Sequence, residues 1–237
     1  MSNLQSWSNL DWVSSAKKLL EWIAIVPQEQ PLLLLVRHSH RETLQNHEEM
    51  ASGGLTELGK RMSFELGKRI PRKGKMHLFT SFVPRCYETA EAIAEGFTQR
   101  GGEVIDIELL PSLVSPHVID EKVWLNLNPD GRNITDYVNM WVSGEFGEKI
   151  EPFKVYRERL MGDTVKRLVS LKENIMHVHV THDFALMSAK RMLLERSLVP
   201  EDREPYLGGL AVTIAGSEIL LNVAGETFPL EIDLRKS

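Results

Sequence analysis

Short apolar runs alternate with amphipathic helical segments along most of this chain. The run at 32–36 is fully apolar and follows Pro31, which is typical of a strand buried on both faces of a parallel sheet. Runs at 76–80, 104–109 and 175–180 predict three further strands. Strands separated by helices in this way indicate an α/β fold. We expect a three-layer sandwich with a mostly parallel central sheet and helices on both faces.

The segments between these runs have the residue spacing of amphipathic helices. Thr56 belongs to a residue type that caps helices, and the helix it begins is predicted to end near Pro71. Pro84 suits the first turn of another helix. Further helices are predicted over 153–171 and 184–194. Near the C-terminus, three alternating runs predict an antiparallel meander: 210–214, 218–223 and 228–232.

Two segments lie outside this alternation. Apolar residues recur at helical spacing over about residues 8–26, which predicts an N-terminal helical extension that Pro27 ends. Over about 111–152 the periodicity is lost, and we interpret this segment as a cap-like insertion over an edge of the sheet. At 237 residues the chain has the length of one sizeable α/β domain. We therefore expect a single domain over residues 1–237 that carries these two additions.

Composition narrows the compartments and partners to consider. The chain has 28 Lys and Arg against 33 Asp and Glu, a net charge of -5, so no bulk attraction to nucleic acid or anionic membranes is expected. No apolar run approaches the ~20 residues of a membrane span. Lys17, Lys18 and Glu21 interrupt the N-terminal apolar residues, unlike a secretory signal. The single cysteine, Cys86, fits a reducing compartment. We expect a cytoplasmic protein of open oligomeric state.

Charged residues gather where three of the predicted strands end. They are Arg37, His38, His40 and Arg41 after the first strand, Arg85 after the second, and His182 and Asp183 after the strand at 175–180. In open α/β sheets, ligands bind outside the carboxyl ends of the strands. A cluster of cations is costly unless an anion compensates it, and planar guanidinium groups suit phosphate oxygens. These residues therefore predict a site for a phosphate or a similar oxyanion.

Four ordered segments carry this chemistry in a recognisable form. They are Leu-Leu-Val-Arg37-His38-Ser39 with His40-Arg41, the Leu-Thr-Glu-Leu-Gly run at 55–59, Thr80-Ser81-Phe82-Val83-Pro84-Arg85, and Val180-Thr181-His182-Asp183. Together they resemble the histidine phosphatase superfamily, which includes the phosphoglycerate mutases and the histidine acid phosphatases. The resemblance covers roughly residues 32–194. It implies a phosphoglycerate mutase-like fold and a phosphorylated small-molecule substrate.

By this resemblance, His38 is the nucleophile that forms a phosphohistidine. The residues that would hold the phosphoryl oxygens are Arg37, Arg41, Arg85 and His182. The chemistry agrees with these roles, because an imidazole nitrogen attacks only when it is neutral and nearby cations lower its pKa. Arginines can stabilise the transferred charge electrostatically, so we expect no metal and no cofactor.

The leaving alkoxide needs a proton, and Asp183 is the predicted general acid. His182-Asp183 resembles the His-Asp pair of the acid phosphatase branch, where the aspartate protonates the leaving group. The mutase-like branch instead uses a glutamate after the third strand. The stretch 109–116 offers no carboxylate for that role.

Selectivity for the rest of the substrate is less constrained by the sequence. The candidates for the substrate pocket are Ser39, His40 and His117. Ser39 departs from the glycine usual in the family and is expected to narrow the pocket or add a hydroxyl contact. Within the insertion, Trp124, Tyr137 and Trp141 are interpreted as a substrate lid or as ordinary packing.

The strand at 175–180 also has a pattern that could indicate a metal site. His177 and His179 share a face of this strand and precede His182, an arrangement that also occurs in metal sites. The spacing matches a metallo-hydrolase signature only loosely. We therefore interpret His177 and His179 as packed strand residues.

The sequence thus predicts a metal-independent phosphomonoester hydrolase that works through a phosphohistidine. Two alternatives remain open. In a phosphoglycerate mutase-like phosphotransferase, the phosphoryl group passes from the histidine to a substrate hydroxyl. In a phosphate-binding scaffold, the site persists without turnover.

Overall fold

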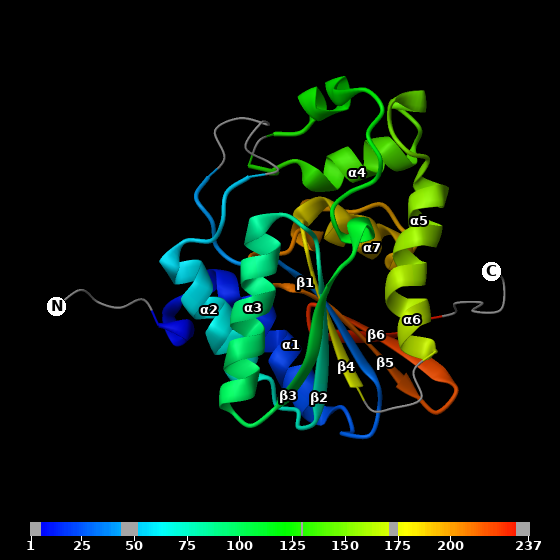
Figure 1. Ribbon diagram of the computed structural model, residues 1–237. Helices are drawn as coiled ribbons and strands as arrows, with labels where there is room; N and C mark the ends of the chain where they lie inside the picture. The colour runs from blue at the N-terminus through cyan, green and yellow to red at the C-terminus, as the bar shows by residue number, and fades with distance from the viewer. Residues whose placement is uncertain (1–5, 44–51, 129, 171–174, 231–237) are drawn as a thin grey trace.

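The computed structural model describes residues 6–43, 52–128, 130–170 and 175–230. Within these residues, seven strands form one sheet in the order β3-β2-β4-β1-β5-β6-β7 (Figure 1). The strands are β1 (Leu32–Arg37), β2 (Lys75–Thr80), β3 (Glu103–Leu109), β4 (Ile175–Thr181), β5 (Gly209–Ala215), β6 (Glu218–Val223) and β7 (Glu226–Leu230). The helices are α1 (Ser14–Ile25), α2 (Glu57–Arg69), α3 (Pro84–Gln99), α4 (Ile134–Val142), α5 (Phe153–Met161), α6 (Arg167–Val169) and α7 (Asp183–Leu194).

Strand direction divides the sheet into two parts. β3, β2, β4 and β1 are neighbours and pair in parallel. β5 then pairs antiparallel with β1, and β6 and β7 continue as the expected meander. The predicted α/β fold class is confirmed, with a mixed sheet whose parallel part holds the strands that precede the charged residues. Residues 231 and 232 of the last predicted strand lie outside the described residues.

The helices cover both faces of the sheet, and β1 shows how they are assigned. Its residues alternate between two hydrophobic clusters, with Leu32, Leu34 and Val36 facing α1, α2 and α3. Leu33 and Leu35 face the cluster that contains residues of α4, α5 and α7. This alternation follows from the period of two along a strand. It explains why the run is apolar throughout, since both faces of β1 are buried.

The predicted helix over 153–171 is interrupted. The structure has α5, then a π-helical turn at Gly162–Lys166, then the short α6. Gly162 has a low intrinsic helix preference, and the Thr164 hydroxyl donates a hydrogen bond to the Leu160 carbonyl at 2.6 Å. These two residues account for the local departure from α-helical geometry. Residue 171 lies outside the described part of the chain.

The segment predicted as a cap-like insertion contains several short helices and α4. α4 packs against α7, and its Tyr137 and Trp141 are buried in the same hydrophobic cluster as Phe184. Trp124 stacks on Tyr137, with ring centroids 6.1 Å apart. The aromatic residues of this segment therefore pack the interior, as one of the two interpretations expected. Its standing as a separate insertion in a single domain stays a prediction.

The N-terminal extension is an integral part of one face of the sheet. α1 contacts β5, and Val13, Ala16 and Ile23 are each fully buried. The indole N–H of Trp22 donates to the hydroxyl of Thr227 on β7 at 3.0 Å. Among the described residues, none of the helices is both long and apolar enough to cross a membrane.

Candidate active site

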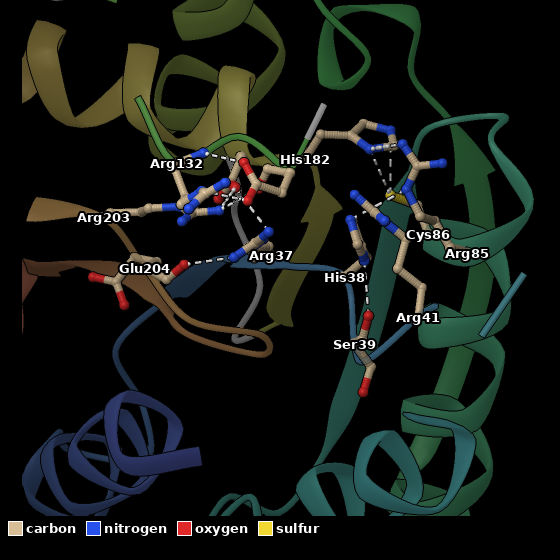
Figure 2. Close-up of polar contacts among 12 residues, drawn as sticks. Arg37, His38, Ser39, Arg41, Arg85, Cys86, Arg132, His182, Arg203 and Glu204 are labelled. Carbon is tan, nitrogen blue, oxygen red and sulfur yellow. Dashed lines mark hydrogen bonds and ion pairs between the residues drawn. The ribbon is translucent and has the colours of Figure 1, made fainter. Parts of the chain in front are cut away.

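The site forms where the parallel strands β2, β4 and β1 end side by side. His38 follows β1, Arg85 lies in the first turn of α3 after β2, and His182 follows β4. Parallel neighbours bring their carboxyl ends to one edge, so three residues distant in sequence meet there. Figure 2 shows His38, Arg85 and His182 pointing toward one another. The structure therefore brings these predicted site residues together.

Hydrogen bonds define the state of the His38 ring. Its Nδ1 lies 2.8 Å from the Ser39 carbonyl oxygen, which can only accept, so Nδ1 carries the proton. The Nε of Arg85, which can only donate, lies 3.2 Å from His38 Nε2. Nε2 therefore presents a lone pair. This nitrogen can attack once the Arg85 N–H turns away from it.

The same reasoning applies to His182. The Nη2 of Arg85 donates to His182 Nδ1 at 3.0 Å, and Nε2 of His182 then donates to the Ser81 hydroxyl at 2.8 Å. Arg85 thus uses two of its donors on two histidine lone pairs. One guanidinium links both imidazoles in a fixed geometry.

Burial and cations keep both imidazoles neutral. The pKa of His38 is held well below its usual value, chiefly by burial and then by the charges of Arg85 and Arg37. The pKa of His182 is lowered well below the usual value by the same causes. Burial also lowers the pKa of Arg85, to about 10, which leaves this arginine protonated at neutral pH. The site therefore joins neutral nitrogens to fixed cations, as the sequence predicted for His38.

Arg37 and Asp183 form a second group beside the histidines. Nη2 of Arg37 lies 2.7 Å from Oδ2 of Asp183, and Nη1 donates to the Glu204 carbonyl at 2.9 Å. Arg203 approaches the same Asp183 oxygen at 3.1 Å. The other oxygen, Oδ1, is buried and has no hydrogen-bond partner in the described part of the chain. Asp183 thus lies between two arginines, one of which the sequence analysis missed.

The segment 111–152 reaches the site through a turn near Gly131. The carbonyl of Asp130 accepts a hydrogen bond from Arg203 Nη2 at 2.7 Å. A Cβ atom at Gly131 would lie only 3.1 Å from Oδ2 of Asp183, and this glycine has a φ of 69°. Arg132, labelled in Figure 2, pairs with the carboxylate of Asp130 at 2.6 Å. The turn therefore covers Asp183 closely.

Ser39 supports the loop that carries His38. The side chain is fully buried, and its hydroxyl donates to the Gly59 carbonyl at 2.8 Å. The backbone N–H of Ser39 donates to the Thr89 hydroxyl at 3.0 Å. A Cβ at Gly59 would lie 2.1 Å from the His40 carbonyl oxygen, so α2 approaches this loop as closely as glycine allows. The Ser39 hydroxyl thus bonds to α2, and the Ser39 carbonyl accepts a hydrogen bond from His38.

His40 and Arg41 lie at the exposed side of the site. Both are half-buried, and the His40 ring is held by a 2.8 Å hydrogen bond between Nδ1 and the hydroxyl of Thr56, the cap of α2. Burial lowers the pKa of Arg41, whose charge also interacts with those of Arg37 and Asp183. Figure 2 shows Arg41 extending toward His38 and Arg85. Arg41 therefore lies with the predicted phosphate-binding residues.

Residues 33–203 match the histidine phosphatase superfamily (branch 1). The chain belongs to this superfamily. A search of curated proteins found no significant match. The role of Asp183, inferred from a resemblance to the acid phosphatase branch, stays a prediction.

Solved structures of several proteins share the fold of this histidine phosphatase. YhfR of Bacillus stearothermophilus has a TM-score of 0.56 at 22% identity, covering 83% of this chain and 97% of that one. Phosphoglycerate mutase from Bacillus anthracis str. Sterne has a TM-score of 0.52 at 13% identity, covering 88% and 95%. Phosphoserine phosphatase from Entamoeba histolytica, in complex with 3-phosphoglyceric acid, has a TM-score of 0.52 at 16% identity, covering 86% and 98%. At these identities the likeness shows the fold alone.

His117, a predicted substrate-pocket residue, and Cys86, the single cysteine, have different surroundings. His117 is exposed, and its backbone N–H donates to the Glu151 carboxylate at 2.8 Å. Cys86 is fully buried 3.4 Å from His182 Nε2, and burial raises the pKa of its thiol to about 12. Such a thiol is a packing residue with little nucleophilic character.

Several residues around the site were not found by sequence reasoning. They are Trp12, Ser81, Arg203, Glu204 and Tyr206. Ser81 stands inside the quoted motif, where its place before Arg85 could have marked it. Three of the others share one physical cause, because β5 runs antiparallel to β1 and begins opposite its end, with Gly209 facing Val36. The segment just before β5 is thereby brought against Arg37.

The two histidines of β4 are packed inside the protein against one face of the sheet. His177 and His179 are buried, and His179 stacks on Phe79 with ring centroids 4.6 Å apart. Both ring nitrogens of His179 are without a hydrogen-bond partner among the described residues. Over the same residues, no three His, Cys, Asp or Glu side chains gather closely enough to hold a metal ion.

Proposed function

We propose that this chain is a phosphomonoester hydrolase that uses His38 as its nucleophile. The observation that carries the proposal is the hydrogen bonding of His38, in which Nδ1–H is fixed by the Ser39 carbonyl and Nε2 keeps its lone pair. A neutral, oriented imidazole among arginines has what phosphoryl transfer to nitrogen requires. Membership of the superfamily supports the same reading, since proteins of this fold include phosphatases and a mutase.

The proposed reaction has two steps. His38 Nε2 attacks phosphorus, the bond between phosphorus and the ester oxygen breaks, and the leaving alkoxide takes a proton from an acid. Water then attacks the phosphohistidine, and the bond between phosphorus and nitrogen breaks. The water gives a proton back to the acid, which releases inorganic phosphate and restores both His38 and the acid. Arg85, Arg37 and Arg41 would turn their N–H donors to the phosphoryl oxygens, which frees His38 Nε2 from Arg85. His182 would help to hold the phosphoryl group with them.

Asp183 is the proposed leaving-group acid. Its Oδ2 accepts from Arg37 and Arg203, while Oδ1 is buried and unpartnered among the described residues. Within that part of the chain, Oδ1 therefore makes no hydrogen bond that would compete with proton transfer. As Arg37 turns toward the phosphoryl group, Asp183 would be released to protonate the alkoxide.

His38→Ala tests the nucleophile. We expect it to reduce hydrolysis of an aryl phosphate at least 1,000-fold, in keeping with the loss of a covalent route. His77→Gln, a histidine on β2, is the matched control and should keep activity. A rapid acid-free quench with radiolabelled substrate should trap one label on the wild type and none on His38→Ala. Full activity in His38→Ala, or activity abolished by EDTA, would refute the proposal.

Asp183→Asn tests the acid. Because an alkoxide needs the proton more than a phenoxide does, the variant should lose about 10- to 100-fold more activity on an alkyl phosphate than on an aryl phosphate. The measurement is kcat/KM for both esters in wild type and variant. Equal losses on the two esters would assign Asp183 to positioning Arg37 instead.

The same assays separate the hydrolase from its alternatives. Release of one inorganic phosphate per ester consumed identifies hydrolysis. Transfer of the label to a second hydroxyl of the substrate would identify a phosphotransferase. Tight binding of phosphate without turnover or labelling of His38 would identify a scaffold.

A further inference from the structure

Three aromatic rings from separate parts of the chain meet beside the nucleophile. Trp12 stacks on His40, with ring centroids 6.0 Å apart and planes inclined by 26°. Tyr206 meets both rings edge-on, at 5.8 Å from Trp12 and 5.4 Å from His40. We call Trp12, His40 and Tyr206 the aromatic platform.

The aromatic platform adjoins the phosphate-binding residues directly. The ring of Tyr206 lies 5.8 Å from that of His38, centroid to centroid. The guanidinium of Arg37 lies over the Tyr206 ring at 4.6 Å. The nearest platform ring thus lies 5.8 Å from the His38 ring, a separation that the leaving group of a bound phosphate ester can span. A group attached to the ester oxygen can reach the platform.

The platform rings remain partly accessible. Trp12, His40 and Tyr206 are each half-buried, whereas Tyr137, Tyr156 and Trp141 are buried in the core. When an apolar or aromatic group covers a partly exposed aromatic surface beside a polar site, the burial stabilises the complex. This is the usual composition of a small-molecule site, in which aromatic walls flank a few polar anchors.

Packed segments flank two of the platform residues along the chain. Trp12 stands next to Val13, which is fully buried, just before α1 begins. On α1, the Ser15 hydroxyl donates to the carboxylate of Glu204, whose carbonyl accepts from Arg37. A short chain of contacts therefore ties α1 to Arg37. A preorganised aromatic surface binds a ring with little loss of side-chain entropy.

Two members of the platform lie outside the segment that matches the superfamily. The match covers residues 33–203, so Trp12 and Tyr206 are additional to it, whereas His40 lies within it. The matched segment contains the proposed phosphate-binding residues. The platform is therefore suited to a task other than phosphoryl transfer, namely the choice of leaving group.

We propose that the aromatic platform binds an aromatic ring on the leaving group, so that the substrates are phosphomonoesters of alcohols bearing such a ring. This inference rests on the proposed function, because it names the substrate class of the same site. A planar ring matches the three platform rings by stacking and by edge-to-face contact. A saturated group of equal size gains only the burial of its apolar surface.

Binding of two matched phosphonates tests the inference without requiring turnover. The pair is 2-phenylethyl phosphonate and 2-cyclohexylethyl phosphonate, which differ in aromaticity and little in size. By calorimetry we expect the wild type to bind the phenyl compound about 3- to 10-fold more tightly, the range of an added aromatic pair. Equal affinities, tighter binding of the cyclohexyl compound, or binding of neither would overturn the inference.

Variants of Trp12 locate the preference. Trp12→Leu should bring the affinity ratio close to one, and Trp12→Phe should restore most of it. Trp7→Phe is the control, because Trp7 precedes the extension, is buried and contacts Arg69 of α2. It should keep the wild-type ratio. A preference that survives in Trp12→Leu would overturn the assignment. If that variant fails to fold, Tyr206→Leu takes its place, since Tyr206 is the platform ring next to His38, and it should likewise bring the ratio close to one.

Turnover distinguishes failure of this inference from failure of the proposed function. The esters 2-phenylethyl phosphate and 2-cyclohexylethyl phosphate have leaving alcohols of similar basicity, so their kcat/KM ratio reports on the ring. Hydrolysis of both at equal rates, lost in His38→Ala, would refute the platform and leave the hydrolase intact. Hydrolysis that persists in His38→Ala would refute the assignment of His38 as the nucleophile. The ratio of the two phosphonate affinities would then test the platform independently.

Discussion

Arg37 is oriented by a charged pair that lies almost wholly out of water. Beneath it, Lys190 and Glu204 form an ion pair, with exposed fractions of 1% and 4%. Lys190 also donates to the Asp202 carbonyl at 2.7 Å, and Glu204 accepts from Ser15. The pair thus joins α7 to the segment that precedes β5 and, through Ser15, to α1. The pair therefore holds in place the carbonyl that receives Arg37.

We predict that Lys190→Met destabilises the protein by about 3–5 kcal/mol, because it leaves the Glu204 carboxylate buried without its cation. The double variant Lys190→Met with Glu204→Gln should recover much of this loss, since no uncompensated charge remains. Urea unfolding monitored by fluorescence measures both. Lys18→Met, at an exposed position on α1, is the control. A cost below about 1 kcal/mol for the single variant would contradict the argument.

At the scale of elements, β4 carries a conflict between its sequence and its environment. Two histidines occupy positions that face the interior of the sheet, beside Phe79 of β2. Burial lowers the pKa of His177 to about 4, with His77 and Arg167 adding to the effect. Burial lowers the pKa of His179 well below its usual value as well. Both must be neutral for β4 to stay packed.

We predict that stability falls as the pH drops from about 6.5 toward 4. In this window an unfolded histidine binds a proton and the folded His177 does not, so acid favours the unfolded state. The stability is fully present above pH 6.5 and is lost as the pH approaches the folded pKa. His177→Leu should make the dependence less steep, measured as the free energy of unfolding in urea at several pH values. The remaining slope comes from His38, His179 and His182, whose pKa values are lowered as well. An unchanged slope in this variant would count against the assignment.

At the scale of the whole molecule, the N-terminal extension completes one face of the sheet. α1 packs on β5, and its apolar side faces the same hydrophobic cluster as α2 and α3 (Figure 1). The extension also supplies Trp12 to the aromatic platform and Ser15 to Glu204. One element thus contributes to both the core and the site.

Ile23 and Ile25 offer a matched test of this packing. Ile23 is fully buried, whereas Ile25, two residues later on the same helix, is 77% exposed. We predict that Ile23→Ala costs about 2–5 kcal/mol, and that Ile25→Ala changes stability by less than about 0.5 kcal/mol. Thermal and urea unfolding measure both. Similar small effects at the two positions would show that α1 contributes little to the core.

Much of the fold was predictable because its signals are local. The apolar run of β1, the cap Thr56 and the first-turn Pro84 each mark an element by its own residues, and all three were placed correctly. The π-helical turn after α5 was not predicted. It depends on a Thr164 hydroxyl bond to Leu160, which hydrophobic periodicity does not report.

By itself, the sequence determined the alternation of strands and helices, the superfamily, and the residues that follow β1, β2 and β4. Parallel strands bring their carboxyl ends together, so order along the chain sufficed to place His38, Arg85 and His182 at one edge. Only the tertiary structure decided that Arg203 pairs with Asp183, and that Trp12 and Tyr206 stand beside His38. These contacts join segments far apart in sequence, through the antiparallel return of β5 and the docking of α1. Such pairings leave no periodicity or spacing in the chain.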